Sequence, residues 1–150
     1  MRPIKFRLWD YANKKFLGNW DKENFYLDID SGVVYKLKGY TRKGFFLRYK
    51  KEELEPLKSI KISQSTGMFD KNGKEIFEGD IVKNTNQTSM AYKDVSAVLY
   101  NEIIGGFTVY FKDIEQYKML GSFDSLEVVG NIYETPEYNG EAQENKENNE

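Results

Sequence analysis

QSTGMFDKNGKEIFEGDIVK, residues 64–83, holds the clearest turn-forming residues of this chain and lies between its basic, aromatic first part and its acidic second part. Residues 70–73 read Asp-Lys-Asn-Gly, and Asn72-Gly73 is the dipeptide that most readily takes positive φ at two successive positions. We therefore expect a tight hairpin turn with positive φ at both Asn72 and Gly73. A second turn is predicted at residues 78–80, Glu-Gly-Asp, immediately before an apolar pair that starts another strand.

The composition of the whole chain favours β-sheet over α-helix. Its 150 residues include 18 Ile and Val and 23 aromatic residues, but only 4 Ala and 10 Leu. β-branched and aromatic side chains are enriched in strands, whereas Ala and Leu are strong apolar helix formers. The sequence therefore predicts a mainly β fold, α+β at most.

Three parts are predicted along the chain. Residues 1–63 are basic and aromatic and should form an N-terminal β-hairpin subdomain. Residues 64–138 combine the turn-rich stretch with short apolar runs, which is typical of a small SH3-like barrel or sandwich. Residues 139–150 are acidic, with one Ala as their only apolar residue, which predicts a disordered tail. The apolar patterns predict strands at residues 4–9, 15–20, 25–29, 33–37, 59–63, 95–100, 106–111 and 126–133.

Three segments carry more specific expectations. Residues 51–54 could form one helical turn that ends before Pro56, because proline cannot occupy a helix interior. Residues 113–120 have mixed apolar spacing and could form a short helix or a strand. The strand at residues 4–9 should be half-buried, with alternating faces formed by Ile4, Phe6 and Leu8 against Lys5, Arg7 and Trp9.

Charge is distributed unevenly along the chain. Residues 1–63 carry 15 Lys and Arg against 8 Asp and Glu, a net of +7. Residues 64–134 carry 6 against 11, a net of −5, and residues 135–150 carry 1 against 5, a net of −4. The basic first part could therefore meet an acidic partner, and the chain's own second part is one candidate.

The chain contains neither Cys nor His. Disulfides, Cys or His nucleophiles, thiolate–zinc sites and imidazole acid–base catalysis are thereby excluded. The first residues lack an apolar run of signal-peptide length, and no segment approaches 18 consecutive apolar residues. We therefore expect a cytoplasmic protein that needs no membrane contact and no cofactor.

The turn-rich stretch and both ends of the chain resemble the YopX-type proteins of bacteriophages and prophages. The central resemblance is carried by Gln64, Thr66-Gly67 and residues 70–82, which include Asp70-Lys71-Asn72-Gly73-Lys74 and Phe77-Glu78-Gly79-Asp80-Ile81-Val82. Residues 4–10 with Asn13-Lys14-Lys15 are similar to the family's opening, and residues 128–137 to its closing strand. The resemblance covers about residues 1–138. It implies a phage origin and a mostly β fold, and it supplies no reaction or catalytic residue.

The conspicuous residues of the central stretch are interpreted as structural. They are Gly67, Asp70, Asn72, Gly73, Glu78, Gly79 and Asp80. Asp70 and Asn72 faintly suggest a calcium loop, but the later ligand positions of an EF-hand are not filled. Glu78 and Asp80 could in principle work as a pair of acid–base carboxylates, whereas the structural reading has Asp80 capping the turn. No catalytic, metal or cofactor residue is predicted.

The best candidate for a binding surface is the segment at residues 38–51, which has six Lys and Arg and no acid. Its candidate residues are Lys38, Tyr40, Arg42, Lys43, Phe45, Arg48, Tyr49 and Lys50. Basic side chains neutralise phosphates and aromatic rings stack on bases, so one interpretation is a nucleic-acid surface. The other is an edge hairpin whose lysines prevent aggregation and lie near carboxylates such as Glu75, Glu78 or Glu127.

Two functions follow from these observations. The first is a non-enzymatic phage accessory protein that binds a host or phage protein in the bacterial cytoplasm. The alternative is a nucleic-acid-binding module that uses residues 38–51. A small enzyme is a more distant reading, and a homo-oligomer is compatible with either function.

Overall fold

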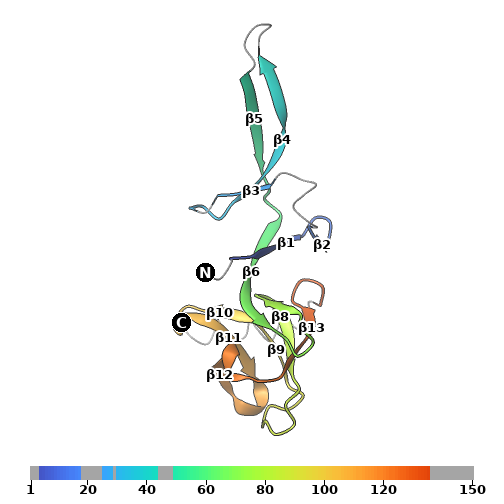
Figure 1. Ribbon diagram of the computed structural model, residues 1–150, viewed down its shortest axis with the longest axis vertical. Coiled ribbons are helices and arrows are strands. Elements are labelled where there is room, and N and C mark those ends of the chain that lie inside the picture. The colour runs from blue at the N-terminus through green and yellow to red at the C-terminus, as the bar shows by residue number, and fades with distance from the viewer. Residues whose placement is uncertain (1–3, 18–24, 29, 44–48, 136–150) are drawn as a thin grey trace. The chain divides into compact units, whose positions relative to one another are not determined.

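The computed structural model of the protein describes residues 4–17, 25–28, 30–43 and 49–135 (Figure 1). The described chain is almost entirely strand, which confirms the predicted mainly β class. Two short 3-10 helices, η1 (Lys112–Ile114) and η2 (Leu120–Ser122), are its helical elements. The strands are β1 (Phe6–Asp10), β2 (Lys15–Phe16), β3 (Phe25–Leu27), β4 (Val34–Lys43), β5 (Tyr49–Pro56), β6 (Ile60–Phe69), β7 (Glu75–Phe77), β8 (Asp80–Asn84), β9 (Val95–Ala97), β10 (Leu99–Asn101), β11 (Gly106–Phe111), β12 (Gln116–Met119) and β13 (Leu126–Asn131).

The chain divides into two compact units. Unit 1 consists of Met1–Arg7 and Ile62–Glu150, and unit 2 of Leu8–Lys61. The division falls inside β1 and β6, so unit 2 is inserted into the sequence of unit 1. The acidic tail predicted at residues 139–150 lies outside the described residues, and its disorder stays a prediction.

Unit 1 is built from small antiparallel sheets around one apolar core. One sheet has the strand order β13-β8-β9, another β10-β11-β12, and β6 pairs with β7. These sheets curl into a partly closed, barrel-like arrangement (Figure 1). The fully buried apolar side chains of the core are Ile76, Val82, Ala91, Val98, Val109, Phe111, Leu120 and Leu126.

The second half of unit 1 follows the predicted strands with one interruption. A hairpin between Asn101 and Gly106 joins β10 and β11, and β11 matches the strand predicted at residues 106–111. Val98 divides the strand predicted at residues 95–100, because its backbone turns to the start of β8. Its N–H donates to the Asp80 carbonyl and its carbonyl accepts the Gly79 N–H, each at 2.8 Å. The ambiguous residues 113–120 are divided among η1, β12 and the first residue of η2, and Glu115, between η1 and β12, has a φ of 47°.

Unit 2 contains the part of β1 that pairs with β2 and a sheet with the order β3-β4-β5. The helical turn predicted at residues 51–54 is wrong, because these residues pair with β4 as part of β5. Pro56 is compatible with this strand because it is the last residue of β5, opposite Tyr35. The register of β4 and β5 shifts between Leu37 and Gly39.

The expected alternation in residues 4–9 is wrong at two positions. Ile4 is 71% exposed, whereas Trp9 is only 2% exposed and buried together with Leu8. Trp9 lies opposite Phe16 in the β1–β2 pair, and the two rings pack edge to face with centroids 4.9 Å apart. Neighbouring strand residues face opposite sides, so both sides of β1 are buried at this end, and the Phe16 ring covers the side that carries Trp9.

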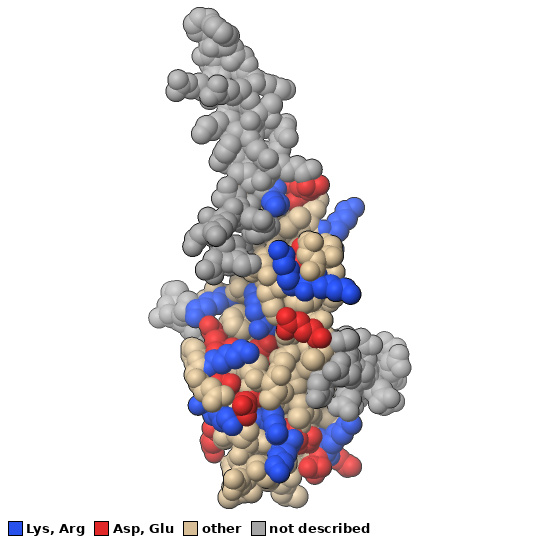
Figure 2. Space-filling model, turned by 90° about the vertical axis from the view of Figure 1, so that its right-hand side faces the viewer, with Lys and Arg blue, Asp and Glu red and all other residues tan. Residues whose placement is uncertain are grey.

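The charged side chains of the described surface are mixed. Figure 2 shows Lys and Arg interspersed with Asp and Glu on the visible face. Some of these charges form ion pairs, such as Lys5 Nζ with a Glu75 oxygen at 2.9 Å and Lys71 Nζ with a Glu127 oxygen at 2.8 Å. In the described part of the chain, no helix is long and apolar enough to span a membrane.

Candidate functional site

The Asp70 carboxylate organises the first turn of the central stretch. One of its oxygens accepts the backbone N–H groups of Asn72 at 2.8 Å and Lys74 at 2.9 Å. The other oxygen accepts the Val128 N–H of β13 at 3.0 Å, and the Lys71 N–H donates to the Leu126 carbonyl at 2.8 Å. The turn therefore hydrogen-bonds to the edge of β13 that does not face β8.

These amides also decide the ionisation of Asp70. Burial on its own would raise the pKa of this carboxyl, but the N–H groups of Val128, Lys74 and Asn72 together outweigh burial, and its pKa is lowered. Both carboxylate oxygens are engaged by backbone amides. Asp70 therefore acts as a structural acceptor.

The prediction that Asn72 and Gly73 both have positive φ, as in a type I′ turn, is wrong. Gly73 has a φ of 80°, but Asn72 is not among the residues with positive φ. The Gly73 N–H donates to the Asp70 carbonyl at 3.0 Å, and the Asp70 N–H donates to the Lys74 carbonyl at 2.8 Å. This pattern fits a three-residue loop in which a type I turn is followed by one left-handed glycine. Asp at the first position of the turn supplies the side-chain acceptor that favours this geometry.

Gly79 forms the second turn, and its position allows little beyond a hydrogen. Its φ is 80°, and a Cβ would lie 3.2 Å from a ring carbon and from the hydroxyl oxygen of Tyr133, and 3.3 Å from Ile132. Its N–H donates to the Val98 carbonyl, and its carbonyl accepts the Ile132 N–H. The turn at residues 78–80 is thus held by Val98, between β9 and β10, and by Ile132 and Tyr133 near the end of the described chain.

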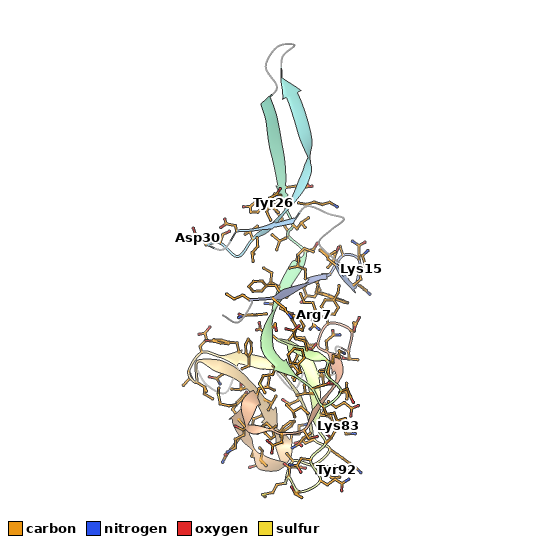
Figure 3. All side chains as sticks on the ribbon, in the orientation of Figure 1. Arg7, Lys15, Tyr26, Asp30, Lys83 and Tyr92 are labelled. Atoms are coloured by element: carbon orange, nitrogen blue, oxygen red, sulfur yellow. The ribbon has the colours of Figure 1, made fainter. Side chains whose placement is uncertain are left out.

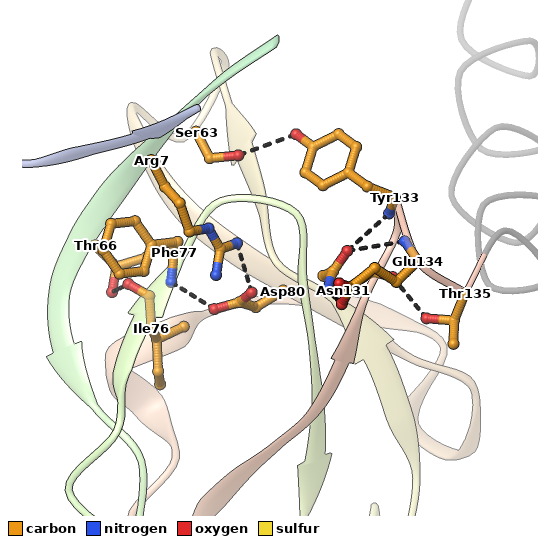
Figure 4. A network of polar contacts seen from close by, with 10 residues as sticks. All are labelled: Arg7, Ser63, Thr66, Ile76, Phe77, Asp80, Asn131, Tyr133, Glu134 and Thr135. Atoms are coloured by element: carbon orange, nitrogen blue, oxygen red, sulfur yellow. Dashed lines mark hydrogen bonds and ion pairs between the residues drawn. The ribbon is translucent and has the colours of Figure 1, made fainter. Parts of the chain in front are cut away.

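Asp80 is the most deeply buried carboxylate of the described unit 1, with 1% of its surface exposed. One oxygen accepts from the Arg7 guanidinium at 2.6 Å, and the other accepts the Phe77 N–H at 2.9 Å (Figure 4). Burial raises the pKa of Asp80, and the positive charge of Arg7 opposes that rise. The Arg7 guanidinium also lies over the Phe77 ring, 4.6 Å from its centroid. Arg7, Phe77 and Asp80 thus form one packed group.

The end of the described chain is fixed by a side-chain network. Asn131 Oδ1 accepts the N–H groups of Tyr133 and Glu134, each at 3.0 Å, and Thr135 Oγ1 donates to the Asn131 carbonyl. Tyr133 then reaches Ser63 of β6 through a hydroxyl–hydroxyl contact of 3.0 Å (Figure 4). Residues of the beginning, the middle and the end of the sequence therefore meet around the two turns.

A family model described as "YopX protein" matches residues 5–138. The chain belongs to the YopX family. It is also similar to a solved structure described as the crystal structure of protein EF1440 from Enterococcus faecalis. That similarity has 26% sequence identity and a TM-score of 0.58, and it covers 91% of this chain and 98% of the other. No curated protein matches the chain.

In this YopX chain, the residues that carry the family resemblance have structural partners. Gly67 has a φ of 73° at the irregular register between β6 and β7, and its N–H donates to Ser65 Oγ. Neighbouring Thr66 donates to the Ile76 carbonyl and is buried. Glu78 is half-buried. Both Asp80 oxygens already accept hydrogen bonds, one from Arg7 and one from the Phe77 N–H. Asp80 therefore serves as an acceptor for the turn, as in the structural interpretation of Glu78 and Asp80.

Sequence reasoning did not single out four residues of this network: Arg7, Ser63, Asn131 and Tyr133. Arg7, Asn131 and Tyr133 had an available signal, because all three lie in the end segments that resemble the YopX family. A basic residue within an apolar strand needs a buried acid nearby, and Asp80 was interpreted only as a cap. The pairing of positions 73 residues apart cannot be read from local patterns.

The basic aromatic segment falls in unit 2, on β4 and β5. Phe45 and Arg48 lie outside the described residues. Of the other candidates, Lys38, Tyr40, Arg42 and Lys43 are on β4, and Tyr49 and Lys50 are on β5. The backbone register places Arg42 opposite Lys50, Tyr40 opposite Glu52 and Lys43 opposite Tyr49.

Two carboxylates that were expected beside this basic segment have cationic partners within unit 1. Glu75 binds Lys5 and also accepts from Ser65 Oγ at 2.7 Å. Glu127 binds Lys71. These contacts lower the pKa of each carboxyl: the Ser65 hydroxyl has the largest effect on Glu75, and Lys71 on Glu127. The positive charges of residues 38–51 are therefore not needed to neutralise Glu75 or Glu127.

Proposed function

We propose that this YopX-family chain is a non-enzymatic binding module that acts on a host or phage protein in the bacterial cytoplasm. The family membership supports a phage or prophage origin and gives no reaction to assign. The carboxylates of the central stretch are used to fix turns, which favours a scaffold over a catalytic centre. We also infer that the barrel-like sheets of unit 1 form an SH3-like domain.

The observation that carries this proposal is the open edge of the β4–β5 pair. β3 pairs with Val34–Lys36 of β4, and among the described residues the part of β4 beyond Lys36 pairs with β5 alone. Among the described residues, Leu37–Lys43 and Tyr49–Leu54 therefore form a two-stranded ribbon with outward-facing backbone groups. Such a ribbon is marginally stable alone and accepts an added strand through main-chain hydrogen bonds.

A site-specific photo-crosslink tests this proposal. Tyr40 on β4 is replaced by p-benzoylphenylalanine in the full chain, and the protein is irradiated in the bacterial cells that express it. We expect one dominant protein adduct. The same substitution at Tyr100, which is half exposed on β10, is the matched control and should not give that adduct. Equal labelling from both positions, or no protein adduct from position 40, would contradict a partner on the ribbon.

The alternative function, nucleic-acid binding, is favoured by one feature of the register. Arg42 lies opposite Lys50, and Thr41 lies opposite Lys51, so positive charges are concentrated at neighbouring positions of the two strands. Like charges directly opposite each other destabilise a strand pair, and an anionic partner would relieve that repulsion. Fluorescence anisotropy with a short single-stranded oligonucleotide at two salt concentrations distinguishes this function from protein binding, because phosphate contacts weaken steeply with salt.

A further inference from the structure

Asn72-Gly73 is one of two Asn-Gly pairs in the chain, the other being Asn139-Gly140. In such a pair the glycine nitrogen can attack the side-chain carbonyl carbon of the asparagine, because glycine has no side chain to hinder the approach. The new C–N bond closes a succinimide ring, the bond to the side-chain nitrogen breaks, and ammonia leaves. The glycine nitrogen gives its proton to solvent, and the departing nitrogen takes one from solvent. Water then opens the ring to aspartate or isoaspartate. Asn72 is exposed, so its sequence and its exposure both indicate a reactive site.

The hydrogen bonds of the turn oppose the first step of this reaction. The attacking nitrogen must lose its proton, but the Gly73 N–H donates to the Asp70 carbonyl at 3.0 Å. A hydrogen bond made by the protonated form disfavours deprotonation. The Asp70 carboxylate also accepts the N–H groups on both sides of this nitrogen, from Asn72 at 2.8 Å and from Lys74 at 2.9 Å. Its negative charge disfavours the negative charge that develops on the attacking nitrogen.

The Asn72 side chain is held as well. The pKa of Glu127 on β13 is lowered chiefly by Lys71 and, to a smaller extent, by a hydrogen bond from the Asn72 side chain. The attack requires the side-chain carbonyl carbon of Asn72 to turn towards the Gly73 nitrogen, so this contact must break first. The turn is also attached to β13 through Asp70 and the Lys71 N–H. The reactive geometry therefore requires the turn to open.

We propose that Asn72 is a modification site that the folded turn keeps closed, so that deamidation proceeds only when the turn opens away from β13. The rate in the folded protein is then reduced by the opening equilibrium. Isoaspartate would prevent the turn from closing again, because it lengthens the backbone between the two N–H groups that share one Asp70 oxygen. This site goes beyond the proposed function, which places a partner on the β4–β5 ribbon of unit 2.

The test compares the full chain with a synthetic peptide of residues 66–78 in the same mildly alkaline buffer. Digestion after glutamate places Asn72 and Asn139 in separate peptides, each with no other asparagine, so mass spectrometry follows the two sites independently. We expect Asn72 to deamidate at least about tenfold more slowly in the protein than in the synthetic peptide, because several hydrogen bonds must open first. Equal rates in the protein and the synthetic peptide would overturn the proposal.

Two variants of the full chain identify the cause of the protection. Asp70→Ala removes the acceptor of the turn and should raise the Asn72 rate at least about fivefold, while Asn139 reacts as in the wild type. Asp28→Ala is the matched control. The Asp28 carboxylate accepts the N–H of Asp30 at 3.0 Å in an exposed turn of unit 2 (Figure 3), and its loss should leave Asn72 at the wild-type rate. An unchanged Asn72 rate in Asp70→Ala, or the same increase in both variants, would overturn the proposal. Circular dichroism checks that each variant is folded, and the comparison of wild type with the synthetic peptide decides if Asp70→Ala is not.

Discussion

At the scale of single residues, the two positive-φ glycines of the central stretch differ in what surrounds them. Gly73 has open space where a Cβ would stand, whereas Gly79 is enclosed by Tyr133 and Ile132. The backbone conformation is the same, with φ at 80° in both turns. The pair therefore separates the cost of a left-handed backbone from the cost of a steric clash.

We expect Gly73→Ala to lower the free energy of unfolding by about 1 kcal/mol, the cost of a left-handed conformation for an L-residue. Gly79→Ala should cost more, about 2 kcal/mol or above, because the Tyr133 ring must also move. Urea unfolding followed by circular dichroism measures both changes. Equal losses in the two variants would show that the close approach of Tyr133 to Gly79 is incorrect.

Asp70 should make stability depend on pH in the acidic range. Its pKa is lowered in the folded state, so its contribution is present above the ordinary carboxyl pKa of about 4 and is lost as the pH falls below that value. Asp70→Asn removes the charge at every pH. We expect the difference in unfolding free energy between wild type and this variant to be about 1–2 kcal/mol near neutral pH and to shrink towards about pH 3.

This comparison also removes the opposite effect of Asp80. The raised pKa of Asp80 favours the folded state below the ordinary carboxyl pKa and loses that contribution as pH rises, and it is common to both proteins. A difference between wild type and Asp70→Asn that stays constant from neutral to acidic pH would contradict the ionised state assigned to Asp70.

At the scale of elements, strands were more predictable than the contacts that hold them. The alternation and turn signals placed strands near β3, β6, β11 and β13, since these depend on local patterns. The side chains that cross between strands were not predictable, because Arg7 with Asp80 and Ser63 with Tyr133 are each 70 or more residues apart. The interruption of the predicted strand at Val98 could not be predicted for the same reason, because the backbone of Val98 hydrogen-bonds to the distant start of β8.

The Arg7–Asp80 pair should connect the start of β1 to the start of β8 strongly. We expect Asp80→Ala to lower the free energy of unfolding by about 3 kcal/mol, because the partly buried guanidinium loses its carboxylate. The Arg7→Met and Asp80→Ala changes should be coupled by about 1–3 kcal/mol in a double-mutant cycle. The same cycle on Lys71 and Glu127, whose side chains are each about one-third exposed, is the control and should give less than about 1 kcal/mol. Similar coupling energies in the two cycles would contradict a special role for the buried pair.

At the scale of the whole molecule, the two units carry opposite charge. Unit 2, Leu8–Lys61, has 12 Lys and Arg and 8 Asp and Glu, a net of +4, and the remaining residues have 10 and 16, a net of −6. These values sum to the chain's −2. The charge separation that was visible in the sequence follows the structural division only in part, because residues 1–7 carry three of the 15 basic residues of the first 63 and belong to unit 1. The inserted position of unit 2 depends on the pairing of distant segments, which the sequence does not show.

The net negative charge of the whole chain favours a protein partner over nucleic acid. We expect wild-type protein to show no binding to a 20-nucleotide single-stranded oligonucleotide at micromolar concentration in about 150 mM salt, because screening at this ionic strength weakens the attraction between the basic residues and phosphate and the chain as a whole carries a net charge of −2. Fluorescence anisotropy at this and at a lower salt concentration makes the measurement. The Arg42→Glu, Lys50→Glu variant is the control: it reverses the charge at one cross-strand pair of the ribbon and should leave the oligonucleotide signal unchanged. Binding by the wild type that this variant abolishes, without a change in melting temperature, would move the assignment from a protein partner to nucleic acid. The ribbon would then act through its charges, and its open backbone edge would no longer carry the function.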